Sequence, residues 1–182
     1  MQSKTFKKAA LAIALAQCVT GVAVAAEGET YTGETNNTIQ NASNVLGNIN
    51  IVGTQVNGQK GGDVSVTATQ GNNTLEGSFK VVSSDGVNGS PVKVVFSAND
   101  SNIVNVTSGN LDLESYANVV FNAQNKNEIT IKNGNIYLNN NGAFQDKANP
   151  VLMYVLATGA EGTNKITGTD IILDKPGMVF LL

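Results

Sequence analysis

Pairs of apolar residues recur along this chain at a nearly constant interval of about 25 residues, and this interval limits the possible folds more than any other feature. Each pair has the pattern apolar–x–apolar, which is typical of a strand with one buried face. The residues between the pairs are polar and rich in Gly and Asn, so each strand is short and ends in a turn. The pattern is incompatible with a helical domain and predicts an all-β repeat protein.

Three series of pairs share this interval and predict three strands per repeat. The first contains Phe79/Val81, Val104/Val106, Ile129/Ile131, Tyr154/Leu156 and Val179/Leu181; the second Val94/Phe96 and Val119/Phe121; the third Leu111/Leu113 and Ile136/Leu138. Such a chain is expected to form a right-handed parallel β-helix, or β-solenoid, whose coils stack at the ~4.8 Å spacing of paired strands.

In this solenoid we expect one buried column formed by Phe79, Val104, Ile129 and Tyr154. Val94 should then stack on Val119, and Leu111 on Ile136. The third series is interrupted where the interval would reach Gly86 and Asn88, and again at Glu161 and Thr163. These interruptions predict loops at 83–90 and 158–164.

The composition suits tight corners. The chain has 25 Asn and 19 Gly, and both residues tolerate the left-handed backbone conformations that such corners need. Asn side chains at equivalent corners can also form hydrogen-bonded ladders along the axis. The regular Val, Ile and Phe positions argue against disorder, which is associated with low hydrophobicity.

The N-terminal segment predicts a secretory signal peptide spanning residues 1–26. Three lysines precede an apolar run, and Ala25 and Ala26 precede the acidic Glu27. A membrane span is the first alternative, but the run is short and diluted by polar residues. The second is a lipoprotein signal ending at Cys18, although Gln17 stands where a small residue is preferred. The predicted organisation is a signal peptide (1–26), a polar N-terminal lead-in or cap (27–44) and a β-solenoid domain (45–182).

Charge and composition exclude several function classes. The chain has no His and no Arg, which removes Ser-His-Asp and Cys-His nucleophile systems and His-type zinc sites. Without the leader it has eight Lys against 14 acidic residues, a formal charge of −6, and no Cys. An acidic, Arg-free surface argues against nucleic-acid binding. We therefore expect no enzymatic activity, no cofactor and no nucleic-acid partner.

Carboxylates are the main candidates for chemistry. Asp112 and Glu114 are two residues apart on a predicted strand and point outward together, as an acid and base would in a polysaccharide-cleaving β-helix. The other candidates are Asp100, Asp170 and Asp174. With no Arg to bind a uronate and no His, we interpret these groups as solvated carboxylates.

Two further features of the sequence resemble binding sites. The oxygen-rich runs Gly61–Asp63 and Asn99–Asn102 do not complete a calcium motif. Tyr137 is the one aromatic residue expected to face outward on a strand, and a single exposed aromatic side chain is common. The sequence thus assigns no catalytic, cofactor-binding or metal residue.

A signal peptide followed by a cysteine-free solenoid rich in Asn, Gly, Thr and Val resembles the passenger region of bacterial autotransporters. It resembles more loosely the secreted adhesins of two-partner systems. The likeness lies in the leader, in the units NLDL, NVVF, NEITI and NGNIYL and in NKITGTDIILD, and it covers most of residues 45–182. The sequence departs from these families because it contains no C-terminal outer-membrane translocator barrel and no NPNG-type motif.

The resemblance implies a non-enzymatic, adhesin-like module, exported by a bacterium and either secreted or displayed on the outer membrane. Its polar Asn- and Thr-rich face would bind a host protein or a glycan, and a separate or missing translocator would export it. The alternatives are a carbohydrate-active β-helix enzyme, related to polysaccharide lyases or hydrolases, and a fimbrial-type subunit. An enzyme needs charged groups that converge in a cleft, so the outward-facing residues should discriminate between these functions.

The C-terminal segment GMVFLL predicts a final coil whose apolar interior nothing covers. The end of a solenoid needs a polar cap, because it otherwise exposes apolar side chains and unpaired backbone groups. We therefore expect self-association through this coil, or its contact with a partner.

Overall fold

The structure is a computed structural model that describes residues 22–24, 30–32, 37–53, 55–56, 59–60, 63–83, 92–114, 117–139, 151–168, 170–174 and 177–182. These residues form strands and turns and no helix. A search of the same residues accordingly finds no helix long and apolar enough to cross a membrane.

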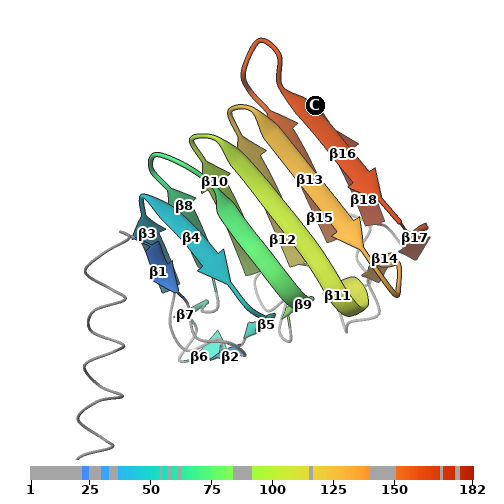
Figure 1. The fold of residues 1–182 in the computed structure, drawn as a ribbon. Helices are drawn as coiled ribbons and strands as arrows, with labels where there is room; N and C mark the ends of the chain where they lie inside the picture. The colour runs from blue at the N-terminus through green and yellow to red at the C-terminus, as the bar shows by residue number, and fades with distance from the viewer. Residues whose placement is uncertain are drawn as a thin grey trace, which may run out of the picture.

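The chain folds as a parallel β-solenoid of about four turns, with about 29 residues per turn (Figure 1). This confirms the predicted all-β parallel solenoid; the turns are longer than the expected 25 residues, and the right hand stays a prediction. One wall is a six-stranded sheet that contains β3 (Asn37–Asn41), β8 (Val64–Ala68), β10 (Val92–Ala98), β12 (Ala117–Ala123), β15 (Val151–Ala157) and β18 (Gly177–Leu181).

The other wall is a ten-stranded sheet with two arms. The first arm contains β1 (Val22–Val24), β4 (Ser43–Leu46), the start of β9 (Asn73–Ser83), the start of β11 (Ser101–Glu114), β13 (Lys126–Ile131) and β16 (Thr163–Thr167). The second arm contains β2 (Thr30–Thr32), β5 (Ile49–Gly53), the ends of β9 and β11, β14 (Ile136–Asn139) and β17 (Ile171–Asp174). Strands β6 (Gln55–Val56) and β7 (Gln59–Lys60) form a separate antiparallel pair.

Alternation along the strands places most of the predicted apolar residues inside the solenoid. In β12, for example, every second side chain from Ala117 to Ala123 is buried. The largest internal side chains are three phenylalanines, whose ring centroids lie 6.0 Å (Phe79–Phe96), 5.9 Å (Phe79–Phe121) and 5.3 Å (Phe96–Phe121) apart. Burial of this continuous column of side chains supplies the main stabilisation of a solenoid.

Two of the predicted series have the predicted register. Val94 pairs with Val119 and Phe96 with Phe121, and Leu111 pairs with Ile136. In the first series, Val104 pairs with Ile129 as expected.

The rest of the first column is wrong. Phe79 pairs with Leu111, while Val104 pairs with Leu75. The cause is an irregularity between Val106 and Leu111, where Gly109 adopts a φ of 72°. The extra residues at this bend shift the second arm relative to the first, so Phe79 lies on the second arm although Val104, 25 residues later, lies on the first.

The C-terminal members of the first series are also misplaced. Ile129 pairs with Ile166 rather than with Tyr154, and Tyr154 faces outward on β15, where it pairs with Val120. Val179 pairs with Met153. The connection between β14 and β15 is longer than the corresponding connections in the other coils. The residue 25 positions after Ile129 therefore lies on β15 rather than on β16, the strand that pairs with β13.

The third series is not interrupted. Leu111 pairs with Phe79, 32 residues earlier, and Ile136 pairs with Ile171, 35 residues later. Of the two predicted loops, 158–164 contains a turn that ends where β16 begins at Thr163, and most of 83–90 lies outside the described residues.

Near the N-terminus, Val22–Val24 of the predicted signal peptide forms β1 and pairs with β4. Within the predicted lead-in, β2 pairs with β5 and β3 with β8. Residues 1–21 lie outside the described part of the chain, so removal of the leader stays a prediction.

Candidate functional site

An asparagine ladder lines the inside of the tight corner that follows each strand of the six-stranded sheet. The side chains are joined from coil to coil through Nδ2–H···Oδ1 hydrogen bonds. These bonds run Asn44–Asn73 (2.8 Å), Asn73–Asn102 (2.9 Å), Asn102–Asn127 (2.8 Å) and Asn127–Asn164 (2.9 Å). The first four of these side chains are buried.

Each ladder amide also donates to a backbone carbonyl of the six-stranded sheet. The acceptors, in ladder order, are the carbonyls of Thr67 (2.9 Å), Ser97 (2.9 Å), Asn122 (3.0 Å), Leu156 (2.7 Å) and Leu182 (2.7 Å). In the four buried members both amide hydrogens are therefore satisfied, which avoids the cost of an unpaired polar group. The ladder ties the two walls together and fixes the shape of the corner.

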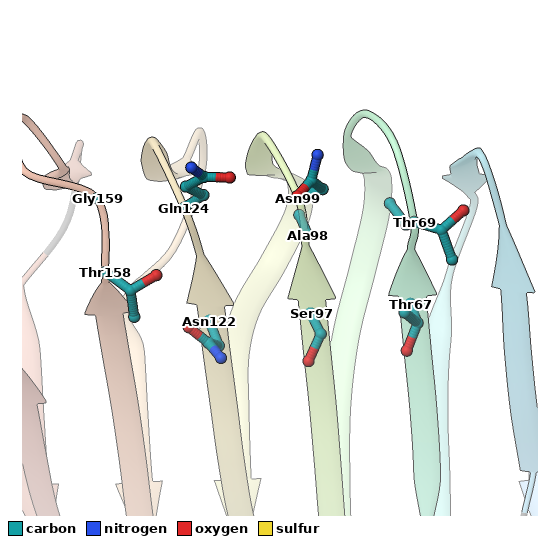
Figure 2. Close-up of a pocket in the computed structure, with 10 residues that line it drawn as sticks. Thr67, Thr69, Ser97, Ala98, Asn99, Asn122, Gln124, Thr158 and Gly159 are labelled. Atoms are coloured by element: carbon teal, nitrogen blue, oxygen red, sulfur yellow. The ribbon is translucent and has the colours of Figure 1, made fainter.

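Outside the same corner lies a polar groove with a volume of about 510 Å³. Figure 2 shows one row of side chains near the ends of the strands and a second row on the corners above them. The groove is lined by Thr67, Ala68, Thr69, Ser97, Ala98, Asn99, Asn122, Gln124, Thr158 and Gly159. None of these residues is charged, and they come from four successive coils.

The alanine positions explain why the groove is hollow. Ala68, Ala98 and Ala123 form a small buried cluster between the two polar rows. Because their methyl groups are short and point inward, the flanking polar side chains stand on either side of a depression. Three successive coils thus repeat the pattern polar–Ala–polar at the corner, while the fourth has Leu156 before Ala157.

Some of the polar side chains in the groove already form hydrogen bonds within the described part of the protein, and others do not. Thr69 and Thr158 donate their hydroxyls to the carbonyls of Asn41 (3.1 Å) and Ala123 (3.2 Å). The structure records no such bond within the described residues for the side chains of Ser97, Asn99, Asn122 and Gln124. These four residues, which we call the central tetrad, lie on β10, β12 and the corners after them.

An outward-facing apolar stripe adjoins the groove on the same sheet. Its central column is Val95, Val120, Tyr154 and Phe180, and its flanking residues are Leu152, Leu156 and Met178. The rings of Tyr154 and Phe180 are stacked, with centroids 4.9 Å apart and planes 10° apart. Leu156 pairs directly with Asn122 of the tetrad, so the polar and apolar surfaces are continuous.

Sequence reasoning missed this stripe because β15 reads VLMYVLA, which is apolar in both phases. The alanine that ends each strand indicates which face of the strand is buried, and it would have resolved the ambiguity in β15. Ala68, Ala98 and Ala123 each end a strand and point inward, so Ala157 at the end of β15 places Tyr154 outside. Tyr137 on β14 is half-buried and pairs with Asp112, on the ten-stranded sheet.

The two strand carboxylates, interpreted from the sequence as solvated groups, lie close to a lysine. Lys80 Nζ lies 2.7 Å from Glu114 Oε1, and Lys80 pairs in register with Asp112. Lys80 and Asp112 line a cavity of about 250 Å³. Burial raises the pKa of Asp112, opposed by a hydrogen bond from Asn110 and by the charge of Lys80. The hydrogen bond to Glu114 raises the pKa of Lys80.

The other carboxylate candidates are dispersed. Asp100 Oδ1 accepts hydrogen bonds from Ser101 Oγ (3.1 Å) and Asn125 Nδ2 (2.8 Å), which makes it part of a corner. The backbone carbonyl of Asp170 accepts from the amide of Ile136 (3.0 Å), and the side chain of Asp174 lies outside the described residues.

The calcium-like runs do not form a site in the part of the chain that is described. Asp63 Oδ1 accepts from the backbone amide of Lys93 (2.8 Å), while Gly61 and Gly62 lie outside the described residues. Asn99–Asn102 forms a corner and the beginning of β11. No group of three His, Cys, Asp or Glu among the described residues could hold a metal ion.

Comparison of the chain with protein-family models, with curated protein sequences and with solved structures gives no match in any of the three. The class of the protein therefore follows from its own geometry. It is a parallel β-solenoid with an internal asparagine ladder and a polar groove on the outside of the ladder corner.

Proposed function

We propose that this chain is a non-enzymatic, adhesin-like binding module, exported and either secreted or displayed on a bacterial surface. The observation that carries the proposal is the uncharged groove that crosses four coils of the six-stranded sheet. Its side chains are hydroxyls and amides, which can donate and accept hydrogen bonds without a charge that must be neutralised.

The rigidity of the corner supports a role in binding. The groove side chains stand on strands paired on both sides, β8, β10, β12 and β15, and the ladder holds the backbone behind them. A surface that is already ordered loses less conformational entropy when a ligand binds. The asparagines inside the corner thus preorganise the polar side chains outside it.

A carbohydrate-active enzyme is the second candidate, and the cluster of Lys80, Asp112 and Glu114 favours it. The raised pKa of Asp112 suits a general acid. However, Glu114 is engaged by Lys80 in an ion pair, which leaves it a poor partner base. The cluster also lies on the ten-stranded sheet, whereas the larger groove belongs to the six-stranded sheet.

The test compares adhesion by the purified chain with adhesion by groove variants. Beads coated with the chain should retain target cells, and the double variant Ser97→Lys/Asn122→Lys should lose most of this retention because two charges enter an uncharged groove. Thr130→Lys, on the outer face of β13, is the matched control and should behave as the wild type. Equal retention by wild type and groove variant would contradict the proposal.

A second measurement separates the enzyme from the binding module. The chain is incubated with neutral and acidic polysaccharides, and reducing ends and unsaturated products are measured. We expect no product above background. Product formation that is lost in Asp112→Asn would favour the enzyme instead.

A further inference from the structure

We infer that the groove and the adjoining apolar stripe together form a binding site for a neutral, linear glycan. This inference rests on the proposed function and names the ligand class of the same site. It is carried by three observations: the uncharged lining of the groove, its extent along the solenoid axis, and the apolar residues beside the central tetrad.

The lining selects for a neutral ligand. None of the ten residues that line the groove carries a charge. A carboxylate or phosphate placed there would lose hydration without gaining an ion-pair partner, which is costly. The hydroxyls and amides of Ser97, Asn99, Asn122 and Gln124 can each donate and accept, and sugar hydroxyls have the same dual capacity.

The sheet arrangement argues against an extended peptide as the ligand. Peptides that bind β-proteins commonly add a strand to an exposed sheet edge. The strands under the groove are β8, β10, β12 and β15, and each has a strand paired on both of its edges. Over these strands a ligand therefore finds no free strand edge to pair with and meets mainly side chains, so recognition depends on hydroxyl and amide contacts rather than on strand addition.

The apolar stripe completes the site. Asn122 is bordered by Leu156 in the next coil, and one step along the strands Val120 is bordered by Tyr154. A pyranose ring has polar edges and C–H-rich faces, so it can hydrogen-bond to the tetrad while its faces contact these apolar side chains. Binding sites commonly combine an apolar surface with a few placed polar groups in this way.

The extent of the groove indicates a chain rather than a single sugar. The lining residues repeat over four coils, and coils are separated by the ~4.8 Å strand spacing. Three such steps span roughly 14 Å, which is longer than one sugar ring. Equivalent polar positions in successive coils would contact successive sugar units.

The experiment titrates the isotopically labelled chain with neutral linear hexasaccharides of different linkages, followed by NMR. Oligogalacturonate and a Ser/Thr-rich peptide serve as the comparison ligands. We expect at least one neutral hexasaccharide to bind, with resonance changes concentrated on β10, β12 and β15. Gln124→Ala and Asn122→Lys should each weaken binding about tenfold or more, while Tyr137→Ala on β14 should leave it unchanged. Because Gln124 is exposed on a corner, its truncation should not disturb folding.

Three results would overturn the inference: no binding of any neutral hexasaccharide at millimolar concentration, preferential binding of oligogalacturonate or the peptide, or unchanged affinity in Asn122→Lys. Periodate oxidises sugar diols. Treating the target cells with it distinguishes a failure of the glycan inference from a failure of the proposed adhesive function. If retention on beads survives periodate but is lost in the Ser97→Lys/Asn122→Lys variant, the groove binds and the glycan inference is wrong. If retention is the same in the groove variant, the proposed function is also wrong.

Discussion

Asparagine has two distinct roles in this protein, and its position relative to the corner decides between them. Inside the corner, the amide of Asn102 is bonded to the next ladder residue and to a carbonyl. Outside the corner, the side chain of Asn122 lines the groove. The first position demands a group that donates twice and accepts once, while the second requires only a polar side chain of suitable size.

Replacing a ladder residue should therefore be costly. Asn102→Ala removes the bonds to Asn127 (2.8 Å) and to the carbonyl of Asn122 (3.0 Å), and the acceptor for Asn73 (2.9 Å). Since these partners stay buried, we expect a loss on the order of 3 kcal/mol in the free energy of unfolding, measured by urea denaturation. Asn125→Ala, which removes an exposed hydrogen bond to Asp100 from the corner one coil later, should change the free energy of unfolding by only about 0.5 kcal/mol. Equal effects of the two variants would show that the ladder adds no stability.

The carboxyl of Asp112 should make stability depend on pH. Burial raises its pKa above the ordinary 3.8, so the folded chain favours the protonated form. The stabilisation linked to this proton is present below 3.8 and is lost as the pH rises through the folded-state pKa. Asp112→Asn, which stays neutral, should therefore have a higher Tm than the wild type at pH 7, and the difference should close in acid.

Glu128 should make stability depend on pH in the opposite direction, so it serves as the comparison for Asp112. Its hydrogen bond with Lys126 lowers its pKa from 4.5, so its contribution is present above 4.5 and is lost as the pH falls through the lowered value. Glu128→Gln should thus lower the Tm at pH 7, with the difference again closing in acid. The same sign in both variants would contradict the assigned causes.

At the scale of the strands, the sequence predicted which residues are buried more reliably than which residues stack. The alternation in β10, β12, β13 and β14 depends only on local hydrophobicity, and their inward residues are buried as expected. Register depends on the length of every connection. The bend at Gly109 and the long chain before β15 changed that length, so a constant interval assigned Phe79 and Tyr154 to the wrong neighbours.

The dependence on register also limits how much of the site could be predicted. An asparagine ladder was expected from the composition, but its members could not be identified, because register was needed to bring Asn73 and Asn102 together. The groove depends on side chains from four coils, which no local pattern connects. Tyr154 was placed inside because both faces of β15 are apolar.

Truncation of one buried strand residue tests the stacking directly. Ile129 lies between Val104 and Ile166 and is fully buried. Ile129→Ala should cost about 2–4 kcal/mol of unfolding free energy, because paired coils above and below prevent the cavity from collapsing. Thr130→Ala, on the outer face of the same strand, should cost far less in the same denaturant titration. A loss below about 1 kcal/mol for Ile129→Ala would mean that the coils can repack.

At the scale of the whole molecule, the predicted export of the chain would determine how the first coil ends. We predict that cleavage removes residues 1–26, because Ala25 and Ala26 fit the small-residue requirement of signal peptidase. Cleavage there would also remove β1 and expose the edge of β4. The intact mass of the exported protein checks this prediction, and a lipid-modified N-terminus at Cys18 would contradict it.

The opposite end of the solenoid has an apolar coil without cover among the described residues. Ile171, Leu173 and Leu181 are 44%, 51% and 48% exposed, whereas their partners one coil earlier, Ile136, Leu138 and Val155, are fully buried. These three side chains face inward, and no further coil packs against them within the residues that the structure describes. An open apolar end with unpaired strand edges favours contact with another such end.

We therefore predict that this 182-residue chain self-associates through its last coil. Sedimentation velocity at tens of micromolar should show a dimer or larger species, and Ile171→Thr/Leu173→Thr/Leu181→Thr should shift it to the monomer. Threonine keeps the preference for strands while removing most of the apolar surface. Val45→Thr, which changes a side chain 42% exposed on β4, is the control and should leave the association intact. A monomeric wild type, or a triple variant that associates equally, would show that burial of these apolar side chains does not drive the contact.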